Sequence, residues 1–472
     1  MGSICAFNGL PFFSSAGRKW IKAQTGEDVN LNQYHPPNRG EAPIPTIPLP
    51  RKEVLYEHVH RYKSSRLSQL FPFIDPFLFE GTIHAAYEVQ SPLTGDVSSS
   101  RACIFAFMAV TSTILNDSDD DGVQNPDDYA YVAYDLLASL LHAHSVTVDG
   151  LQALLMLCLY SQAMLGDVLS LEVLLSSATR LVFHLGGHIS PGKSEGDNNR
   201  SLGLRSHIRN LFWVCYIFNQ ECSLRTGLPP NLDDANCDLT LPEAPGLDPQ
   251  RHGGCPSFLI SLIRLGIIQS QIYRRLYSVA ALNQTDAELL ATIRDLDELL
   301  EDWKLSIPVE TRPTFMHRST DVDMESSILQ LEYHYCMATI HQASGRCITW
   351  TQNKDTRGLG SSLGISVEAS RSLLQKLLHS EILVHRYNIL FCLPHLTAAM
   401  IHLFCDILFH PLDPGCHADL GLMDMIRELM VAQAAQLRTP APIAFNMQLE
   451  FVKELSLELQ RLARNAIRQA AV

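Results

Sequence analysis

The sequence GHISPGKS, from Gly187 to Ser194, has the spacing of a phosphate-binding loop. In such a loop, backbone amides surround the phosphates of a nucleotide, while the Lys and the final Ser serve the terminal phosphates and Mg²⁺. This chemistry requires a β-strand before the loop and a helix after it. Here a helical pattern precedes Gly187, and the polar sequence EGDNNR follows Ser194. We therefore interpret the stretch as a polar loop after a helix, in which Lys193 binds no nucleotide.

The acidic sequence DSDDDGVQNPDD, from Asp117 to Asp128, places carboxylates at several ligand positions of a calcium-binding EF-hand loop. Asp128 stands at the last position, where a longer Glu normally reaches the ion, and Pro126 stiffens the end. The same aspartates suit a diphosphate-using helical enzyme only with a second Asn/Ser/Glu triplet, which we do not find. We interpret the stretch as a solvated loop and keep a P-loop or diphosphate-using enzyme as the less favoured function.

Four histidines have spacings that suggest metal binding. His184 and His188 are separated by two glycines that end the helix, and no Glu follows His184, so we expect loop histidines. His142 and His144 do not face one another on a helix. A Ser-His-Asp arrangement stays open, because sequence alone does not reveal it, although we recognise no G-x-S-x-G elbow. We predict no catalytic residue, no cofactor-binding residue and no metal ligand, and we expect a protein that is not an enzyme.

The elements that carry these residues are predicted to be helices. Apolar residues recur at i, i+3, i+4 and i+7 through most of the chain, and alternation with period two is almost absent. The fold class is therefore all-α, with a large multi-helix body and a Pro-rich N-terminal arm. We expect the arm and linker in residues 1–50, the first part of the body in 51–310 and a C-terminal helical part of the same body in 311–472. In the second half, helices are expected near 256–280, 287–305, 325–348, 366–385, 389–409, 419–437 and 447–470.

A helical hairpin is predicted around residues 149–186. Asp149 is the expected N-cap of its first helix, Gly166 separates the two helices, and Gly186 ends the second. A second apolar segment, 389–409, is long enough to cross a membrane but contains Pro394 and Asp406. We interpret that segment as a buried core helix.

Composition excludes several classes of protein. The hydrophobic content of 46% in 472 residues argues against a mainly disordered chain. The net charge of −14, without a basic stripe, makes the chain a poor non-specific binder of DNA phosphates. The 12 cysteines are scattered over apolar helix faces, and no signal peptide is recognised. We expect buried thiols in a reducing compartment.

The stretch from Arg205 to Glu243 has the most defined pattern in the chain. It begins with a helix that is apolar nearly all round, which is typical of a buried helix with others packed about it. Gly227 is able to adopt a positive φ at the end of this helix, and Pro229 and Pro230 prevent its continuation. An acidic pair that begins at Asp233 follows, within reach of Arg225. From the residues alone, we interpret the stretch as a core helix and a rigid turn.

The same stretch resembles the signature of the fungal-specific transcription factor domain, the regulatory region downstream of the binuclear zinc cluster in fungal regulators. The resemblance extends upstream to residues 67–80 and 151–188 and, more weakly, to the last third of the chain. The residues that match the signature and form the predicted structural site are Arg209, Phe212, Trp213, Arg225, Gly227, Pro229, Pro230 and Asp233. Ser223, Leu241 and Pro242 also match the signature.

The resemblance implies transcriptional regulation in a fungal nucleus by a non-enzymatic helical domain, with a metabolic or biosynthetic pathway as its target. It implies a domain that responds to a small-molecule effector or a partner protein and that forms homo- or heterodimers, with no membrane contact. It also implies that FFSSAGRKWI packs onto the body through Phe12, Phe13, Trp20 and Ile21. A ligand-sensing or partner-binding protein without DNA binding is the alternative.

The resemblance does not extend to the DNA reader. The family's reader is a zinc cluster of six cysteines that contains two C-x₂-C pairs, and this chain has no such pair. Zinc is therefore expected only in that cluster, and we predict no cofactor in this chain. Two explanations stay open: a regulator that naturally lacks its own reader, or a chain from which the N-terminal cluster has been lost. Promoter DNA is reached through the cluster or through a partner protein.

Overall fold

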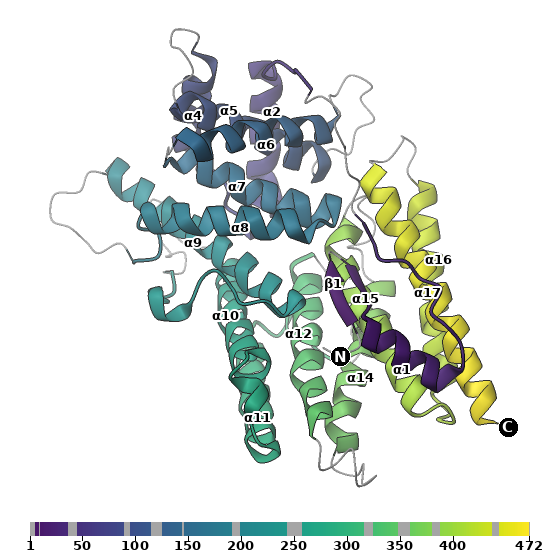
Figure 1. The fold of residues 1–472 in the computed structure, drawn as a ribbon. Coiled ribbons are helices and arrows are strands. Elements are labelled where there is room, and N and C mark those ends of the chain that lie inside the picture. Colours follow the sequence, from purple (N-terminus) through teal and green to yellow (C-terminus); the bar gives the residue numbers. More distant parts are fainter. Residues whose placement is uncertain are drawn as a thin grey trace. The chain divides into compact units, whose positions relative to one another are not determined.

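The computed structural model consists almost entirely of helices in the residues that it describes, which confirms the all-α prediction (Figure 1). One two-stranded hairpin near the N-terminus is the exception. The described residues are 5–8, 10–35, 45–88, 95–114, 125–143, 146–190, 199–242, 257–315, 324–347, 359–379, 388–436 and 443–471.

The chain forms two compact units. The central unit contains Asn38–Cys222 and Pro230–Gly266, and the terminal unit contains Met1–Pro37, Ser223–Pro229 and Ile267–Val472. This spatial division is a different one from the sequence segments 1–50, 51–310 and 311–472, which stay a prediction of domain organisation.

The central unit is built around two helices that are apolar on nearly every side. They are α5 (Gly95–Ile114), in which residues 102–110 are all buried, and α7 (Val148–Tyr160), in which residues 151–160 are all buried. Helix α5 packs against α4 (Pro76–Tyr87), α6 (Pro126–Ala143) and α7. This unit also contains α2 (Lys52–Ser64), α3 (Arg66–Leu70), α8 (Val168–His184), most of α9 (Asn199–Thr226), a short 3₁₀ helix, η2 (Asp234–Asn236), and the first part of α10 (Ser257–Ile272).

The helical hairpin α7–α8 is present, with one correction at its start. The N-cap of α7 is Thr147, whose hydroxyl accepts a hydrogen bond from the Gly150 amide, and not Asp149. Asp149 instead accepts hydrogen bonds from Thr82 (2.7 Å) and Ser100 (2.5 Å), so its carboxylate joins α7 to α4 and α5. A π-helical turn, η1 (Ser161–Leu165), extends α7 and ends at Gly166, whose φ is 60°.

Helix α8 ends as the sequence predicts. Gly186 has a φ of 75°, and its amide donates to the carbonyl of Phe183. The next amide, of Gly187, donates to the carbonyl of Val182. This pair of bonds is a Schellman motif, which satisfies carbonyl groups that the end of a helix leaves without donors.

The terminal unit is centred on α15 (Asn388–Phe409). This helix packs against α12 (Met324–Gln342), α14 (Leu359–Leu378), α16 (Cys416–Gln436) and α17 (Ile443–Ala470). Helices α16 and α17 run side by side (Figure 1). The unit also contains the end of α10 (Ser257–Ile272) with its π-helical extension η3 (Tyr273–Tyr277), the 3₁₀ helices η4 (Ala281–Asn283) and η5 (Ala343–Arg346), and α11 (Asp286–Leu305).

Helix α14 differs most from its predicted position. It covers Leu359–Leu378 in place of 366–385. The Gly- and Ser-rich sequence at its start predicts a loop, because glycine has a low helix propensity. Packing of α14 against α12 and α15 outweighs that local preference. The other predicted helices of the second half are present, with shifted ends.

The N-terminal residues are folded against the terminal unit. Strands β1 (Cys5–Asn8) and β2 (Leu10–Phe13) pair antiparallel, and α1 (Ser15–Thr25) follows. Phe13 and Ile21 are buried, and the Trp20 ring lies 5.1 Å from that of Phe409, which confirms their predicted packing. The Phe12 side chain and the Pro-rich residues 36–44 lie outside the described part of the chain. The Pro-rich N-terminal arm is therefore not confirmed, because residues 10–25 form a strand and a helix with buried side chains, and the sequence patterns do not predict the strands.

Within the part of the chain that the structure describes, two helices are long and apolar enough to cross a membrane, namely Val97–Ile114 in α5 and Cys392–Phe409 in α15. Of these windows, 83% and 78% respectively is buried inside the protein. The interpretation of residues 389–409 as a core helix is confirmed by this burial.

Candidate functional site

Arg209 is the centre of the signature segment in the central unit. Its side chain is on α9 and is buried, although it carries a charge. One terminal nitrogen donates to the carbonyl of Gly187 (3.0 Å), and the other donates to the carbonyls of Asp238 and Thr240. The guanidinium therefore joins α9 to two loops, one after α8 and one after η2. Burial lowers the pKa of Arg209 from its ordinary value, while the charge of Asp238 opposes this shift.

Two aromatic signature residues cover the same guanidinium. Its central carbon lies 4.5 Å from the ring centre of Phe212 and 4.7 Å from that of Trp213. The spacings i+3 and i+4 from Arg209 bring both rings to its side of the helix. Such cation–π contacts are stronger where water is excluded, and both rings are fully buried.

The loop after α8 is held close to α9. A Cβ atom on Gly187 would lie 3.1 Å from the carbonyl oxygen of Ile208 on α9, so any side chain there would push the two apart. The His188 carbonyl accepts from the Asp238 amide (2.9 Å), and the Asp238 carboxylate accepts from the Ser190 amide (3.2 Å). Gly187 thus belongs to a structural junction.

The turn at the end of α9 has the predicted backbone. Gly227 has a φ of 74°, its amide donates to the Ser223 carbonyl (2.9 Å), and the Ser223 hydroxyl donates to the Leu228 carbonyl (2.6 Å). Pro229 is exposed, and Pro230 begins the segment that returns to the central unit.

The acidic pair after the turn makes local hydrogen bonds. Asp233 caps η2 by accepting from the Ala235 amide (3.0 Å), and Asp234 accepts from the Tyr216 hydroxyl (2.7 Å). The predicted pairing of Arg225 with this acidic pair stays a prediction. All these interactions are those of a packed junction, and the assignment of the signature residues as a structural site likewise stays a prediction.

A second buried charge cluster lies in the terminal unit. Glu332 on α12 accepts hydrogen bonds from Gln269 (2.8 Å) and from His395 on α15 (2.9 Å). Burial alone would raise the pKa of Glu332, but the charges of His395 and Arg225 and these two hydrogen bonds hold it below its ordinary value. The Tyr335 ring covers His395 at 5.1 Å. We interpret Glu332 and His395 as an internal ion pair that joins α12 to α15.

The structure describes only part of the residues considered above for nucleotide, calcium and metal binding. A helix precedes Gly187 where a phosphate-binding loop needs a strand, and Lys193 lies outside the described residues. Most of the acidic stretch, including Asp117, also lies outside them. Of the histidines, His184 is exposed in the last turn of α8, and His188 packs on the Phe183 ring at 4.8 Å beyond the helix end. Both are loop or helix-end histidines, as predicted, whereas the side chains of His142 and His144 are not described.

A Ser-His-Asp set is present that the sequence reasoning overlooked. The sequence GSSLG at residues 360–364 fits the pattern G-x-S-x-G, and Ser362 lies 3.0 Å from Nδ1 of His341. Nε2 of the same ring lies 3.5 Å from Asp297. In hydrolases of this type the serine faces Nε2, and it stands on a turn between a strand and a helix. Here Ser362 lies within α14 and faces the other nitrogen, so the geometry favours a structural network.

The ten cysteines whose side chains the structure describes are free thiols, and only Cys237 among them is not buried. Burial raises the pKa of Cys215 and of Cys392 to about 12. Such thiols are inert at neutral pH, because the thiolate is the reactive form. Buried free thiols match the expectation from the sequence.

Residues 62–305 match the family described as the fungal specific transcription factor domain. The matched segment begins within α2 and ends with α11, and it contains the Arg209 junction and the Gly227 turn.

Several curated proteins are similar to parts of this chain. An ABC-transporter-regulating transcription factor of Aspergillus oryzae is 30% identical over 300 residues, which is 56% of this chain and 32% of the relative. A protein with the same description in Aspergillus fumigatus is 31% identical over 295 residues, with the same coverage. An uncharacterized transcriptional regulatory protein of Schizosaccharomyces pombe is 26% identical over 246 residues, covering 47% and 30% of the two chains. The matches to the two Aspergillus proteins thus span about a third of those relatives' length.

Proposed function

We propose a function from one premise: the chain belongs to the family of fungal specific transcription factor domains. It acts as the regulatory, or effector, domain of a transcriptional regulator in the nucleus. The observation that carries this proposal is the family match over residues 62–305. The family is one of transcription factor domains and not of enzymes.

The geometry of the signature residues supports a non-catalytic role. Arg209 is satisfied by backbone carbonyls and covered by two aromatic rings, so it presents no charge to a substrate. Gly227 supplies a backbone conformation. Residues used in this way build a scaffold, and the scaffold then acts through what binds to it.

The chain reaches promoter DNA through a zinc cluster that is not among residues 1–472 or through a partner protein. The net charge of −14 and the lack of a C-x₂-C pair support this indirect route. The two Aspergillus relatives are described as regulators of ABC transporters. Transporter promoters are therefore the first targets to test for this chain.

A tethering experiment tests the proposal. The chain is fused to a heterologous DNA-binding domain and expressed with a reporter that carries the matching operator. We expect a change in reporter transcription that requires the fusion and disappears when the chain is absent. The matched control is the fusion with Arg209→Met, which disrupts the junction. Reporter output equal to that of the DNA-binding domain alone, from a fusion shown to be folded and nuclear, would overturn the proposal.

The alternative is a partner-binding or ligand-sensing protein that does not act at promoters. The predominance of acidic side chains on α11 supports the partner-binding version. Chromatin immunoprecipitation of the full chain separates the two, because only a regulator is enriched at promoters.

A further inference from the structure

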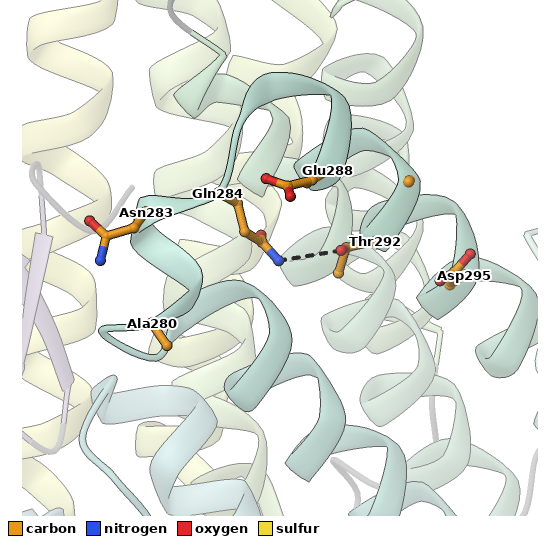
Figure 2. Close-up of a pocket in the computed structure, with 7 residues that line it drawn as sticks. Ala280, Asn283, Gln284, Glu288, Thr292 and Asp295 are labelled. Atoms are coloured by element: carbon orange, nitrogen blue, oxygen red, sulfur yellow. Dashed lines mark hydrogen bonds between the residues drawn. The ribbon is translucent and has the colours of Figure 1, made fainter.

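A shallow depression of about 500 Å³ lies in the terminal unit, beside the turn that connects η3 to α11. Figure 2 shows its lining side chains, with Gln284 and Glu288 between Asn283 and Asp295. The lining comes from that turn and from one face of α11, and consists of Ala280, Asn283, Gln284, Glu288, Ala291, Thr292 and Asp295.

The hollow has a simple origin in the sequence. Four lining residues of α11 have the spacing i, i+3, i+4 and i+7, which places them on one helix face. Two of the lining residues, Ala280 and Ala291, are small, so longer neighbours stand around them. A face of this shape accepts a protruding side chain from another protein.

One polar atom at the depression lacks a partner. The side-chain nitrogen of Gln284 lies 3.5 Å from the Thr292 hydroxyl (Figure 2). The side-chain oxygen of Gln284 is buried and has no hydrogen-bond partner within the described residues. A buried acceptor without a donor costs free energy, so rotation of this amide toward an incoming N–H group would be favourable.

Two aliphatic side chains of the same turn are exposed. Val279 is 83% exposed and Leu282 is 59% exposed. They flank Ala280 and Asn283 of the lining. Burying aliphatic side chains of this size on binding is favourable, so they are suitable anchors for a partner.

The charge of α11 specifies the chemistry of what binds. This helix, DAELLATIRDLDELLEDWKL, carries many more acidic than basic side chains. Glu288 caps the helix together with Thr285, and hydrogen bonds from Thr285 lower the pKa of Glu288, which keeps it ionised. The capping box occupies the amides of Thr285 and Glu288 and places the Glu288 carboxylate at the helix start, so this end of α11 disfavours an anion. Asp295 pairs with Arg275 at 2.7 Å, and both are partly exposed.

We propose that this depression is a docking site for a short segment of a partner protein, one that presents aliphatic side chains next to lysine or arginine. The aliphatic side chains pack between Val279 and Leu282 and over Ala291. The basic side chains face Glu288 and Asp295. This inference concerns binding alone and does not depend on whether the chain acts at promoters.

The test uses a fluorescein-labelled amphipathic helical peptide made of leucine and lysine, and a matched peptide in which glutamate replaces each lysine. Binding to the full chain is measured by fluorescence anisotropy at low and moderate salt. We expect saturable binding of the lysine peptide, weakened by salt, and little binding of the glutamate peptide. Hydrogen exchange with and without peptide is expected to show protection at residues 278–295.

Variants locate the site. The double variant Val279→Ser/Leu282→Ser is expected to lower the affinity for the lysine peptide about tenfold. Asp295→Asn is expected to lower that affinity about threefold. The matched control is Leu305→Ser/Val309→Ser, which changes two residues of similar exposure (58% and 61%) in the same unit. Circular dichroism of each variant confirms that the fold is retained, as the exposure of these side chains predicts.

Three results would overturn the proposal: equal binding of the two peptides, unchanged binding by the Val279/Leu282 variant, or protection confined to other residues. A fourth is self-association. If sedimentation shows a dimer that the Val279/Leu282 variant abolishes, while the lysine peptide does not bind, the occupant is a second copy of this chain.

Discussion

Arg209 in the central unit and Glu332 in the terminal unit are both buried charges, but the fold stabilises them in different ways. The direct contacts of Arg209 are with neutral groups, namely three backbone carbonyls and two aromatic rings, and the charge of nearby Asp238 adds to them. Glu332 instead has an ionisable partner, His395, together with the amide of Gln269.

The difference concerns how the contribution of each cluster to stability depends on pH. The carbonyls around Arg209 do not titrate, and a guanidinium keeps its charge at any physiological pH. The Arg209 junction is therefore a permanent tie between α9 and its loops. The Glu332 cluster contains a carboxylate whose pKa differs from its ordinary value, so its contribution to stability varies with pH. Region-resolved hydrogen exchange is the measurement that tests this distinction in each variant below, because the two units need not unfold together.

The largest effect is expected for Arg209→Met. Methionine keeps much of the aliphatic volume but removes the donor to three carbonyls, the buried one of Gly187 and the partly buried ones of Asp238 and Thr240, which is expected to cost about 3 kcal/mol in the central unit. The matched control is Arg180→Met, because Arg180 is exposed on α8 of the same unit. Equal stability of the two variants would mean that the Arg209 contacts do not support the junction.

Glu332→Gln is expected to have the next largest effect. Glutamine keeps the shape and an acceptor for Gln269 but removes the negative charge next to His395. We expect a loss of about 2 kcal/mol at neutral pH, confined to the terminal unit. The control is Glu298→Gln, because Glu298 is an exposed residue of α11 in the same unit. A neutral or stabilising result would show that burial of the ion pair costs as much as its attraction provides.

Gly227→Val provides a reference in which no charge changes. The site has space for a side chain, since a Cβ atom at this position would have nothing within 4 Å, but its φ of 74° disfavours any L-residue. We expect a cost of about 1–2 kcal/mol from backbone strain alone. At helical Gly203, which also has free space, Gly203→Ala is expected to stabilise by about 0.5–1 kcal/mol. Unchanged melting of Gly227→Val would count against the turn.

The smallest effect is a difference in acid sensitivity. The pKa of Glu332 is lowered in the folded protein, so its contribution is present above its unfolded pKa and is lost as pH falls through the folded value. From neutral pH down through that folded value, the wild-type terminal unit is therefore expected to lose more stability than Glu332→Gln. The stability profile of Arg209→Met is expected to stay much closer in shape to that of wild type, because Arg209 is only the smallest of the causes that lower the pKa of nearby Asp238. If the stability of Glu332→Gln fell with pH in parallel with that of wild type, the two clusters would not differ in their dependence on pH.

Sequence patterns correctly predicted the features of the fold that depend on neighbouring residues alone. The end of α8 at Gly186 and the positive φ of Gly227 follow from glycine's lack of a side chain. The burial of α9 and α15 follows from helices that are apolar nearly all round. Local preference failed at the start of α14 and at the cap of α7, where packing in one case and a neighbouring threonine in the other had the stronger effect.

The sequence by itself therefore determined the helical class, the signature segment and the family that it resembles, because these depend on residue type and spacing along one chain. Only the tertiary structure decided which groups meet across helices. It brought Arg209 to carbonyls more than twenty residues away, Glu332 to His395, and the turn at Val279 to one face of α11. Such long-range contacts depend on how the side chains of distant segments pack, and a periodic pattern along the chain does not predict them.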